Sequence, residues 1–174
     1  MSTLSCGGGI SSLPATAEGF SKIEQSLKNK FGENAYYTDI SLSYDKSVGN
    51  IVGVTVTEDP ESLTMEQWNQ MKDFWKQNSE ISLEVPEGYK ASDFMYQLDG
   101  KISLTELGRL VEKSKNKLKS EENQKEPTLK LAYILFPENG NILKTEYFVN
   151  LQPEKGGNTF RFQYDINGNL IKME

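Results

Sequence analysis

Histidine is absent from this chain of 174 residues, cysteine occurs once, and no apolar run approaches the roughly 18 residues of a membrane-spanning helix. The lack of histidine excludes histidine-dependent nucleophilic triads and histidine-ligated metals. One cysteine excludes an intrachain disulfide and a thiolate metal cage. A surplus of basic residues is also missing, since 19 Lys and Arg face 25 Asp and Glu for a net charge of −6, which argues against nucleic-acid binding. We therefore expect a protein that is not an enzyme and needs neither a cofactor nor a metal.

Residues 1–15 are small and uncharged, and three consecutive glycines at 7–9 predict a flexible tether. Within it, Thr3-Leu4-Ser5-Cys6 resembles the lipobox of bacterial lipoproteins. The resemblance implies a lipid on Cys6, a periplasmic protein anchored to a bacterial membrane, and glycines that hold the folded part away from the bilayer. The alternative is a free cysteine in a cytosolic tail.

Helical spacing of apolar residues predicts a first helix over 16–31, ended by Gly32. Two alternating segments, 40–44 and 52–56, predict a hairpin. A second helix over 64–77 is expected from the capping-box spacing of Thr64 and Gln67, and from an apolar stripe of Trp68, Met71, Phe74 and Trp75. Ser103 with Glu106 predicts the start of a third helix.

The last third of the chain predicts an antiparallel meander. Its expected strands are about 129–136, 142–151, 158–164 and 169–173, separated by Asn-Gly or Gly-Gly turns. The expected fold class is therefore α+β, with a C-terminal four-stranded meander packed with about three helices in one domain over 16–174.

A helix–strand–turn–strand order occurs twice, at 16–57 and 103–150, with a Gly-Asn-aliphatic turn in each. Either the chain is a diverged tandem duplication with halves 16–100 and 101–174, or two hairpins converged on one turn chemistry. This order, together with the C-terminal residues Tyr164, Asp165, Gly168, Leu170 and Ile171, resembles the PepSY-like and beta-lactamase-inhibitor-like modules. The resemblance implies a secreted or periplasmic α+β unit that binds or inhibits other proteins.

Only carboxylates remain as candidates for catalysis: Glu58-Asp59, Glu121-Glu122, and Asp93 with Asp99. We interpret them as solvated surface acids, so a carboxylate-dependent hydrolase is the less favoured alternative. Asp165 to Asn169 has part of a calcium-loop spacing, but its glycine comes at the fourth position, which favours a hairpin turn.

Aromatic residues supply the candidate partner-binding positions, which are Tyr36, Tyr37, Tyr147, Phe148 and Arg161. Tyr147 and Phe148 point to opposite faces of one strand, so one of the two is expected to leave the core face. The expected function is a non-catalytic, lipid-anchored periplasmic protein-binding domain, of inhibitor or immunity type. A structural or assembly lipoprotein of an envelope complex is the alternative. The expected partner is a protein, with the membrane reached only through the lipid, and with no nucleic acid and no small-molecule cofactor.

Overall fold

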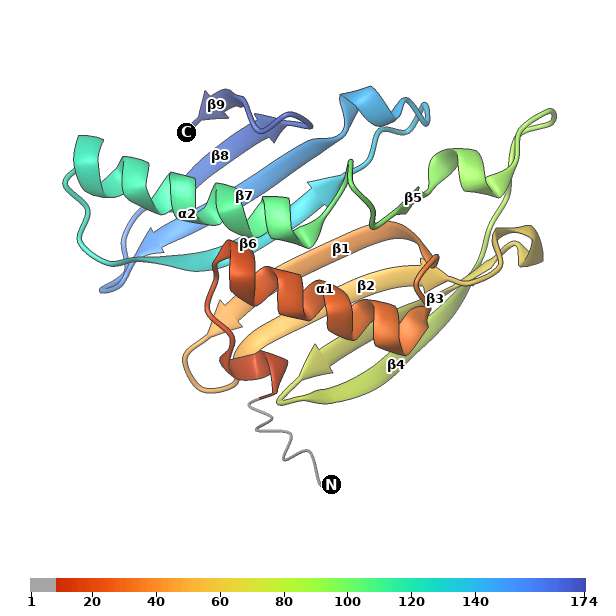
Figure 1. Ribbon diagram of the computed structural model, residues 1–174, viewed down its shortest axis with the longest axis horizontal. Helices are drawn as coiled ribbons and strands as arrows, with labels where there is room; N and C mark the ends of the chain where they lie inside the picture. Colours follow the sequence, from red (N-terminus) through yellow and green to blue (C-terminus); the bar gives the residue numbers. More distant parts are fainter. Residues whose placement is uncertain (1–8) are drawn as a thin grey trace.

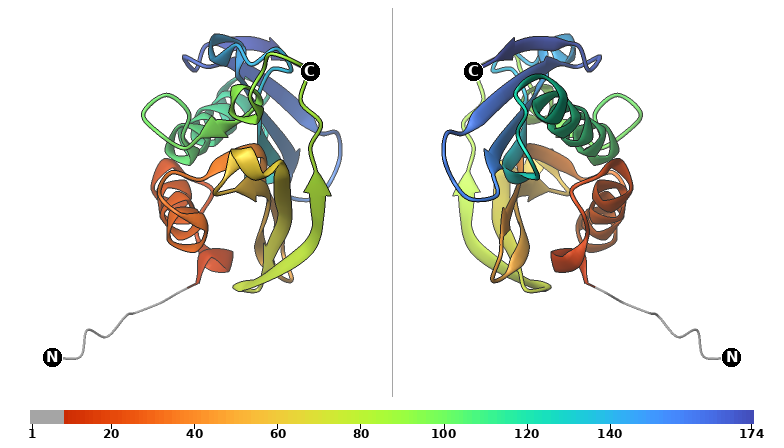
Figure 2. Two further views of the ribbon diagram at one scale, coloured as in Figure 1. Left: turned by 90° about the vertical axis from the view of Figure 1, so that its right-hand side faces the viewer. Right: turned by 90° about the vertical axis from the view of Figure 1, so that its left-hand side faces the viewer.

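The computed structural model describes residues 9–174, which form one nine-stranded antiparallel sheet with two α-helices on the same face (Figures 1 and 2). The strand order is β4-β3-β2-β1-β6-β7-β8-β9, and the short β5 pairs with β1. The helices are α1 (Ala17–Phe31) and α2 (Leu104–Glu121). The strands are β1 (Tyr36–Asp45), β2 (Gly49–Thr57), β3 (Thr64–Met71), β4 (Phe74–Ser82), β5 (Tyr96–Gln97), β6 (Pro127–Leu135), β7 (Glu146–Pro153), β8 (Phe160–Asp165) and β9 (Leu170–Met173). Short 3-10 turns lie at η1 (Ile10–Ser12), η2 (Pro60–Ser62), η3 (Ala91–Phe94) and η4 (Ile142–Lys144).

The α+β class is correct, but a four-stranded meander with about three helices is wrong. Strands β6 to β9 are half of a larger sheet, and α1 and α2 are the α-helices of residues 9–174. The expected helix over 64–77 is instead the β3–β4 hairpin. Its two-residue turn is Lys72-Asp73, both with positive φ (51° and 65°). Such turns usually contain Asn-Gly or Asp-Gly, so Lys-Asp does not signal one in the sequence.

Both helices begin where the sequence predicts. The Thr16 hydroxyl accepts the N–H of Gly19, and the Ser103 hydroxyl accepts the N–H of Glu106. Each cap satisfies a backbone donor that the helix itself leaves free. The side chains that face the sheet are fully or almost fully buried: Phe20, Ile23, Leu27 and Phe31 in α1, and Leu104, Leu107, Leu110, Val111 and Leu118 in α2.

The sheet has approximate two-fold symmetry about the central β1–β6 pair. Both strands carry a bulge at the same point of the pattern, at Thr38 in β1 and at Lys130 in β6. In the register, Ile40 lies opposite Ile134 and Leu42 opposite Ala132, and a two-fold axis through the pair between them exchanges these two pairs. The order of one helix followed by four main strands accordingly occurs twice, as α1–β4 and as α2–β9. A common origin of the halves stays a prediction.

The two antiparallel helices stabilise each other's first turns. Glu112 of α2 accepts the N–H of Ala17, the first residue of α1, at 2.9 Å. Glu24 of α1 accepts the N–H of Leu104, the first residue of α2, at 2.7 Å. A carboxylate at a helix N-terminus is favoured both as an acceptor and by the helix dipole. Gly108 permits this approach, because a Cβ there would lie 2.3 Å from the carbonyl oxygen of Thr16.

Residues 9–15 belong to the expected tether, yet they pack on the folded body. The side chain of Asn50, which is 4% exposed, donates to the carbonyls of Ile10 and Leu13 at 2.9 and 2.7 Å. Ser11 donates its N–H and its hydroxyl to the carboxylate of Asp73. The lipidation candidate Cys6 lies outside the described residues.

We predict that Glu24→Ala and Glu112→Ala each lower the free energy of unfolding by about 1–3 kcal/mol, because each leaves a backbone N–H of the first helical turn without its charged acceptor. Chemical denaturation measures the change. The matched control is Glu121→Ala, which removes an exposed carboxylate from the last turn of α2, where it pairs with Lys117. Loss of stability in the control equal to that in the two variants would contradict the prediction.

Candidate functional site

The face of the sheet opposite the helices, here called the outer face, carries a row of mainly polar and aromatic residues that crosses the sheet. A small apolar cluster around Met65 and Met95 packs at one end of this face. The row consists of register partners on successive strands: Asn69, Gly53, Ser41, Tyr133, Phe148, Gln163 and Lys172.

The five predicted partner-binding residues divide between the two faces. Tyr37 and Tyr147 are 1% and 0% exposed and belong to the core between sheet and helices. Tyr36 is half-buried against the Met65 cluster. Phe148 and Arg161 lie together on the outer face. Of the five residues, this pair alone forms a joint surface feature.

Tyr133, which the sequence analysis did not single out, completes a cluster with this pair, here called the Arg161 cluster. The rings of Tyr133 and Phe148 stack with centroids 4.9 Å apart and planes 7° from parallel. The guanidinium of Arg161 lies 4.9 Å from the Phe148 centroid and donates to the Tyr133 hydroxyl at 2.7 Å. The ring face attracts the cation, and the hydroxyl fixes its orientation.

Beside the cluster lies a hollow of about 370 Å³, lined by Phe148, Arg161, Gln163, Lys172 and Glu174. Lys172 pairs with the Glu174 side chain, and the hydrogen bond from Lys172 holds the pKa of this carboxyl below its usual value. The amide of Gln163 is held by Glu146, to which it donates at 2.9 Å. The polar walls of the hollow are thus fixed by neighbouring side chains.

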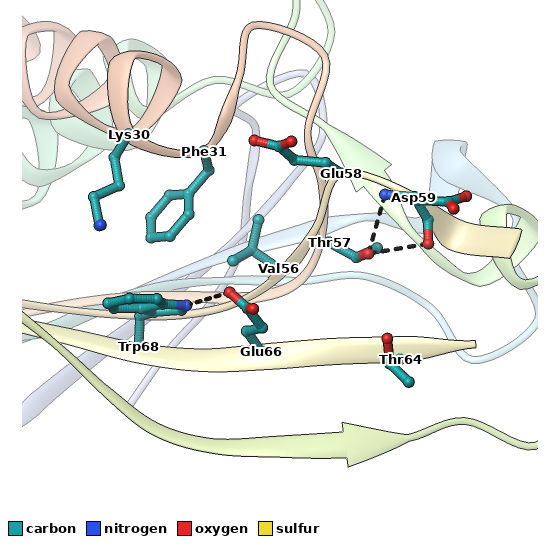
Figure 3. A pocket seen from close by; sticks show the side chains of 9 residues that line it. All are labelled: Lys30, Phe31, Val56, Thr57, Glu58, Asp59, Thr64, Glu66 and Trp68. Carbon is teal, nitrogen blue, oxygen red and sulfur yellow. Dashed lines mark hydrogen bonds between the residues drawn. The ribbon is translucent and has the colours of Figure 1, made fainter. Parts of the chain in front are cut away.

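A second concave site, the α1-end cleft, has a volume of about 400 Å³ and lies between the last turn of α1 and strands β2 and β3 (Figure 3). The ammonium of Lys30 lies 4.3 Å from the centroid of a Trp68 ring, and the indole N–H donates to Glu66 at 2.7 Å. Glu58 and Asp59 form the remaining acidic wall. Carboxylates and an indole ring suit a cationic group, and Lys30 already occupies the ring face.

The α1-end cleft exists because Trp68 and Trp75 meet Phe31 at the end of α1. Their ring centroids lie 5.8 and 5.1 Å from the Phe31 centroid, in edge-on geometry. Both tryptophans are half-buried against the core. They come from neighbouring strands of a hairpin, rather than from the single helix expected over 64–77.

The other acidic candidates have local structural partners. Asp93 accepts the N–H of Lys90, Asp99 accepts that of Lys101, and Glu121 pairs with Lys117. Within residues 9–174, no group of three or more His, Cys, Asp or Glu side chains is arranged to hold a metal.

The segment from Asp165 to Asn169 is the β8–β9 hairpin turn, as expected. One carboxylate oxygen of Asp165 accepts the N–H groups of Asn167 and Asn169, and the other accepts the Asn169 side chain. These bonds, the side-chain bond first, hold the pKa of Asp165 below its usual value. Gly168 has a φ of 77°, which a glycine adopts without strain.

Neither helix in the described part of the chain is long and apolar enough to cross a membrane. Comparison of the chain with protein-family models, curated proteins and solved structures gave no match. Function is therefore inferred from the side chains themselves.

Because the core tyrosines are buried, the free energy of unfolding changes with pH in the alkaline range. Burial raises the pKa of the Tyr147 phenol to about 12, and it also raises the pKa of Tyr37 and Tyr96. Unfolded tyrosine ionises near pH 10, so the unfolded chain releases these protons first. The contribution of the buried Tyr147 phenol to the free energy of unfolding is therefore complete below about pH 10 and is lost as the pH rises toward about 12.

We predict that the free energy of unfolding falls steadily between about pH 10 and 12, and that Tyr147→Phe makes the fall less steep, because one phenol no longer ionises on unfolding. Urea unfolding at a series of pH values gives the slope. Tyr89→Phe, which changes a 61% exposed tyrosine, is the control. The prediction is wrong if the slopes of the Tyr147 variant and the wild type coincide.

Proposed function

We propose that this protein is a non-catalytic protein-binding domain of the bacterial periplasm, anchored by a lipid on Cys6, which holds its partner on the outer face of the sheet. The observation that carries the proposal is the Arg161 cluster. A protein of inhibitor or immunity type is the specific form that the net charge of −6 favours, since this charge attracts a basic partner.

The Arg161 side chain is exposed, held in place and available to a partner. Among residues 9–174, its side-chain hydrogen bond is to the Tyr133 hydroxyl, and the nearby Glu174 carboxylate, whose pKa the charge of Arg161 helps to lower, pairs with Lys172. A guanidinium has five N–H donors, so those not used by Tyr133 can bind a carboxylate or carbonyl of a partner. Arginine and tyrosine are enriched among the residues that carry most of the binding energy in interfaces. Preorientation by Phe148 and Tyr133 reduces the side-chain entropy lost on binding.

Arg109 provides the internal comparison, because the chain contains two arginines and each occupies a different face. The guanidinium of Arg109 donates twice to the carboxylate of Glu106, at 2.6 and 2.8 Å, on the exposed side of α2. Because Arg109 already forms this bidentate ion pair with Glu106, it is less available to a carboxylate of a partner. The two arginines therefore separate binding on the outer face from general attraction by positive charge.

The lipid anchor is supported by the lipobox-like Thr3 to Cys6. We predict that the protein from cells that make and process it partitions into a detergent phase, and that Cys6→Ser moves it to the aqueous phase because the acyl chains are lost. Mass spectrometry of Cys6 identifies the modification. An unmodified cysteine in an aqueous-phase protein would contradict the anchor and leave the binding proposal standing.

For the binding proposal, we predict that proteins captured from envelope extract by the immobilised chain are bound at least about tenfold more weakly by Arg161→Ala, the loss that about 1.4 kcal/mol produces. Arg109→Ala is the matched control and is expected to capture as the wild type does. Arg161→Lys keeps the charge but loses the planar stack, and is expected to bind weakly. Unfolding curves check that each variant is folded. Equal capture by all variants would contradict a binding site at the Arg161 cluster.

An assembly subunit of an envelope complex is the alternative form of the same activity. The captured proteins distinguish the two forms, since an inhibitor captures an enzyme whose activity it lowers, whereas an assembly subunit captures structural components.

A further inference from the structure

The turn between β3 and β4 exposes two large apolar side chains at the end of the sheet. Phe74 is 79% exposed, the highest value among the exposed large hydrophobic side chains of residues 9–174, and its register partner Met71 is 48% exposed. Because they are register partners, both side chains lie on the same face. Lys72 in the turn and Lys76 in β4 flank them. We call Met71–Phe74 the β3–β4 tip.

The N-terminal segment is held against this same tip. The carboxylate of Asp73 accepts the N–H of Ser11 at 2.8 Å and the Ser11 hydroxyl at 2.9 Å. Gly9 lies so close that a Cβ on it would be 2.1 Å from the Asp73 carboxyl carbon. The first described residue of the chain is therefore positioned beside the β3–β4 tip (Figure 1).

Covalent geometry then limits how far Cys6 can lie from the tip. Cys6 precedes Gly9 by three residues, and an extended chain spans at most about 3.6 Å per residue, so the two Cα atoms lie within about 11 Å of each other. A tether that ended at residue 15 would allow the body to stand well away from an anchored Cys6. Attachment of Gly9 and Ser11 at Asp73 removes most of that length.

We infer that the β3–β4 tip inserts into the interface of the lipid bilayer to which Cys6 is anchored. The inference depends on the lipid anchor of the proposed function. An exposed phenylalanine and methionine bury apolar area among acyl chains, and the long side chains of Lys72 and Lys76 place their ammonium groups among the headgroups. In this orientation the end of the sheet with the β3–β4 tip contacts the membrane, and the outer face with Arg161 remains exposed to solution.

The opposite end of the molecule offers a matched control. The β6–β7 connection lies at the other end of the sheet from the β3–β4 tip, as the antiparallel register of β1 and β6 requires (Figure 1). It carries Leu143, which is 71% exposed and has the same apolar character as Phe74. An orientation set by the Cys6 anchor brings Phe74, and not Leu143, to the lipid.

The single cysteine allows this orientation to be tested whether or not cells attach a lipid to it. The full chain is coupled through Cys6 to phosphatidylcholine vesicles that contain a maleimide-headgroup lipid. Two variants, Phe74→Trp and Leu143→Trp, are compared on vesicles with and without bromine on the acyl chains, and the emission of the wild type, with its Trp68 and Trp75, is subtracted. Urea unfolding checks that both variants are folded.

We predict that acyl-chain bromine quenches the added emission of Phe74→Trp and shifts it to the blue, while the emission of Leu143→Trp is unchanged. Equal quenching of both variants, or of neither, would overturn the inference. A blue shift of Phe74→Trp in solution without vesicles, with a doubled mass by light scattering, would also overturn it, because a second copy of the chain would then cover the tip. Failure of lipid attachment in cells is read separately, from the mass of Cys6.

Discussion

The structure depends on the reciprocal contact between its two helices, in which each helix supplies a carboxylate to the first backbone N–H of the other. Glu24 and Glu112 fix the helices as an antiparallel pair, and their own strands β1 and β6 pair at the centre of the sheet. Alone, each half would lack hydrogen-bond partners for the N-terminus of its helix and for the edge of β1 or β6 that faces the other half. The halves therefore share one core, and the sheet is continuous from β4 to β9.

Because both helices cover the same face, the opposite face is left to polar and aromatic side chains. The Arg161 cluster forms there because Tyr133 of β6 and Phe148 of β7 are register partners. Arg161 of β8 lies two residues before Gln163, the register partner of Phe148, and therefore on the same face. The two-fold relation also sends the β3–β4 turn and the β6–β7 connection to opposite ends of the sheet. The membrane contact proposed at one end and the partner binding proposed on the outer face are thus compatible in a single molecule.

Local patterns predicted the elements whose signals are local. The caps at Thr16 and Ser103 predicted both helices. Alternation predicted the β1–β2 hairpin, at 40–44 and 52–56, and the strands β6 to β9. The β3–β4 hairpin was missed because its turn, Lys72-Asp73, lacks glycine and its apolar residues fit helical spacing equally well.

The site was only partly predictable for a related reason. Alternation shows that Tyr147 and Phe148 face opposite ways, but not which one faces the helices. The stack with Tyr133 depends on a register between strands that sequence spacing does not contain.

The most direct test of the shared core is urea unfolding of the wild type followed by two probes. Trp68 and Trp75, both in the first half, report its unfolding by fluorescence, while far-ultraviolet circular dichroism reports the whole chain. One shared core predicts coincident transitions, whereas separate midpoints for the two probes would contradict it.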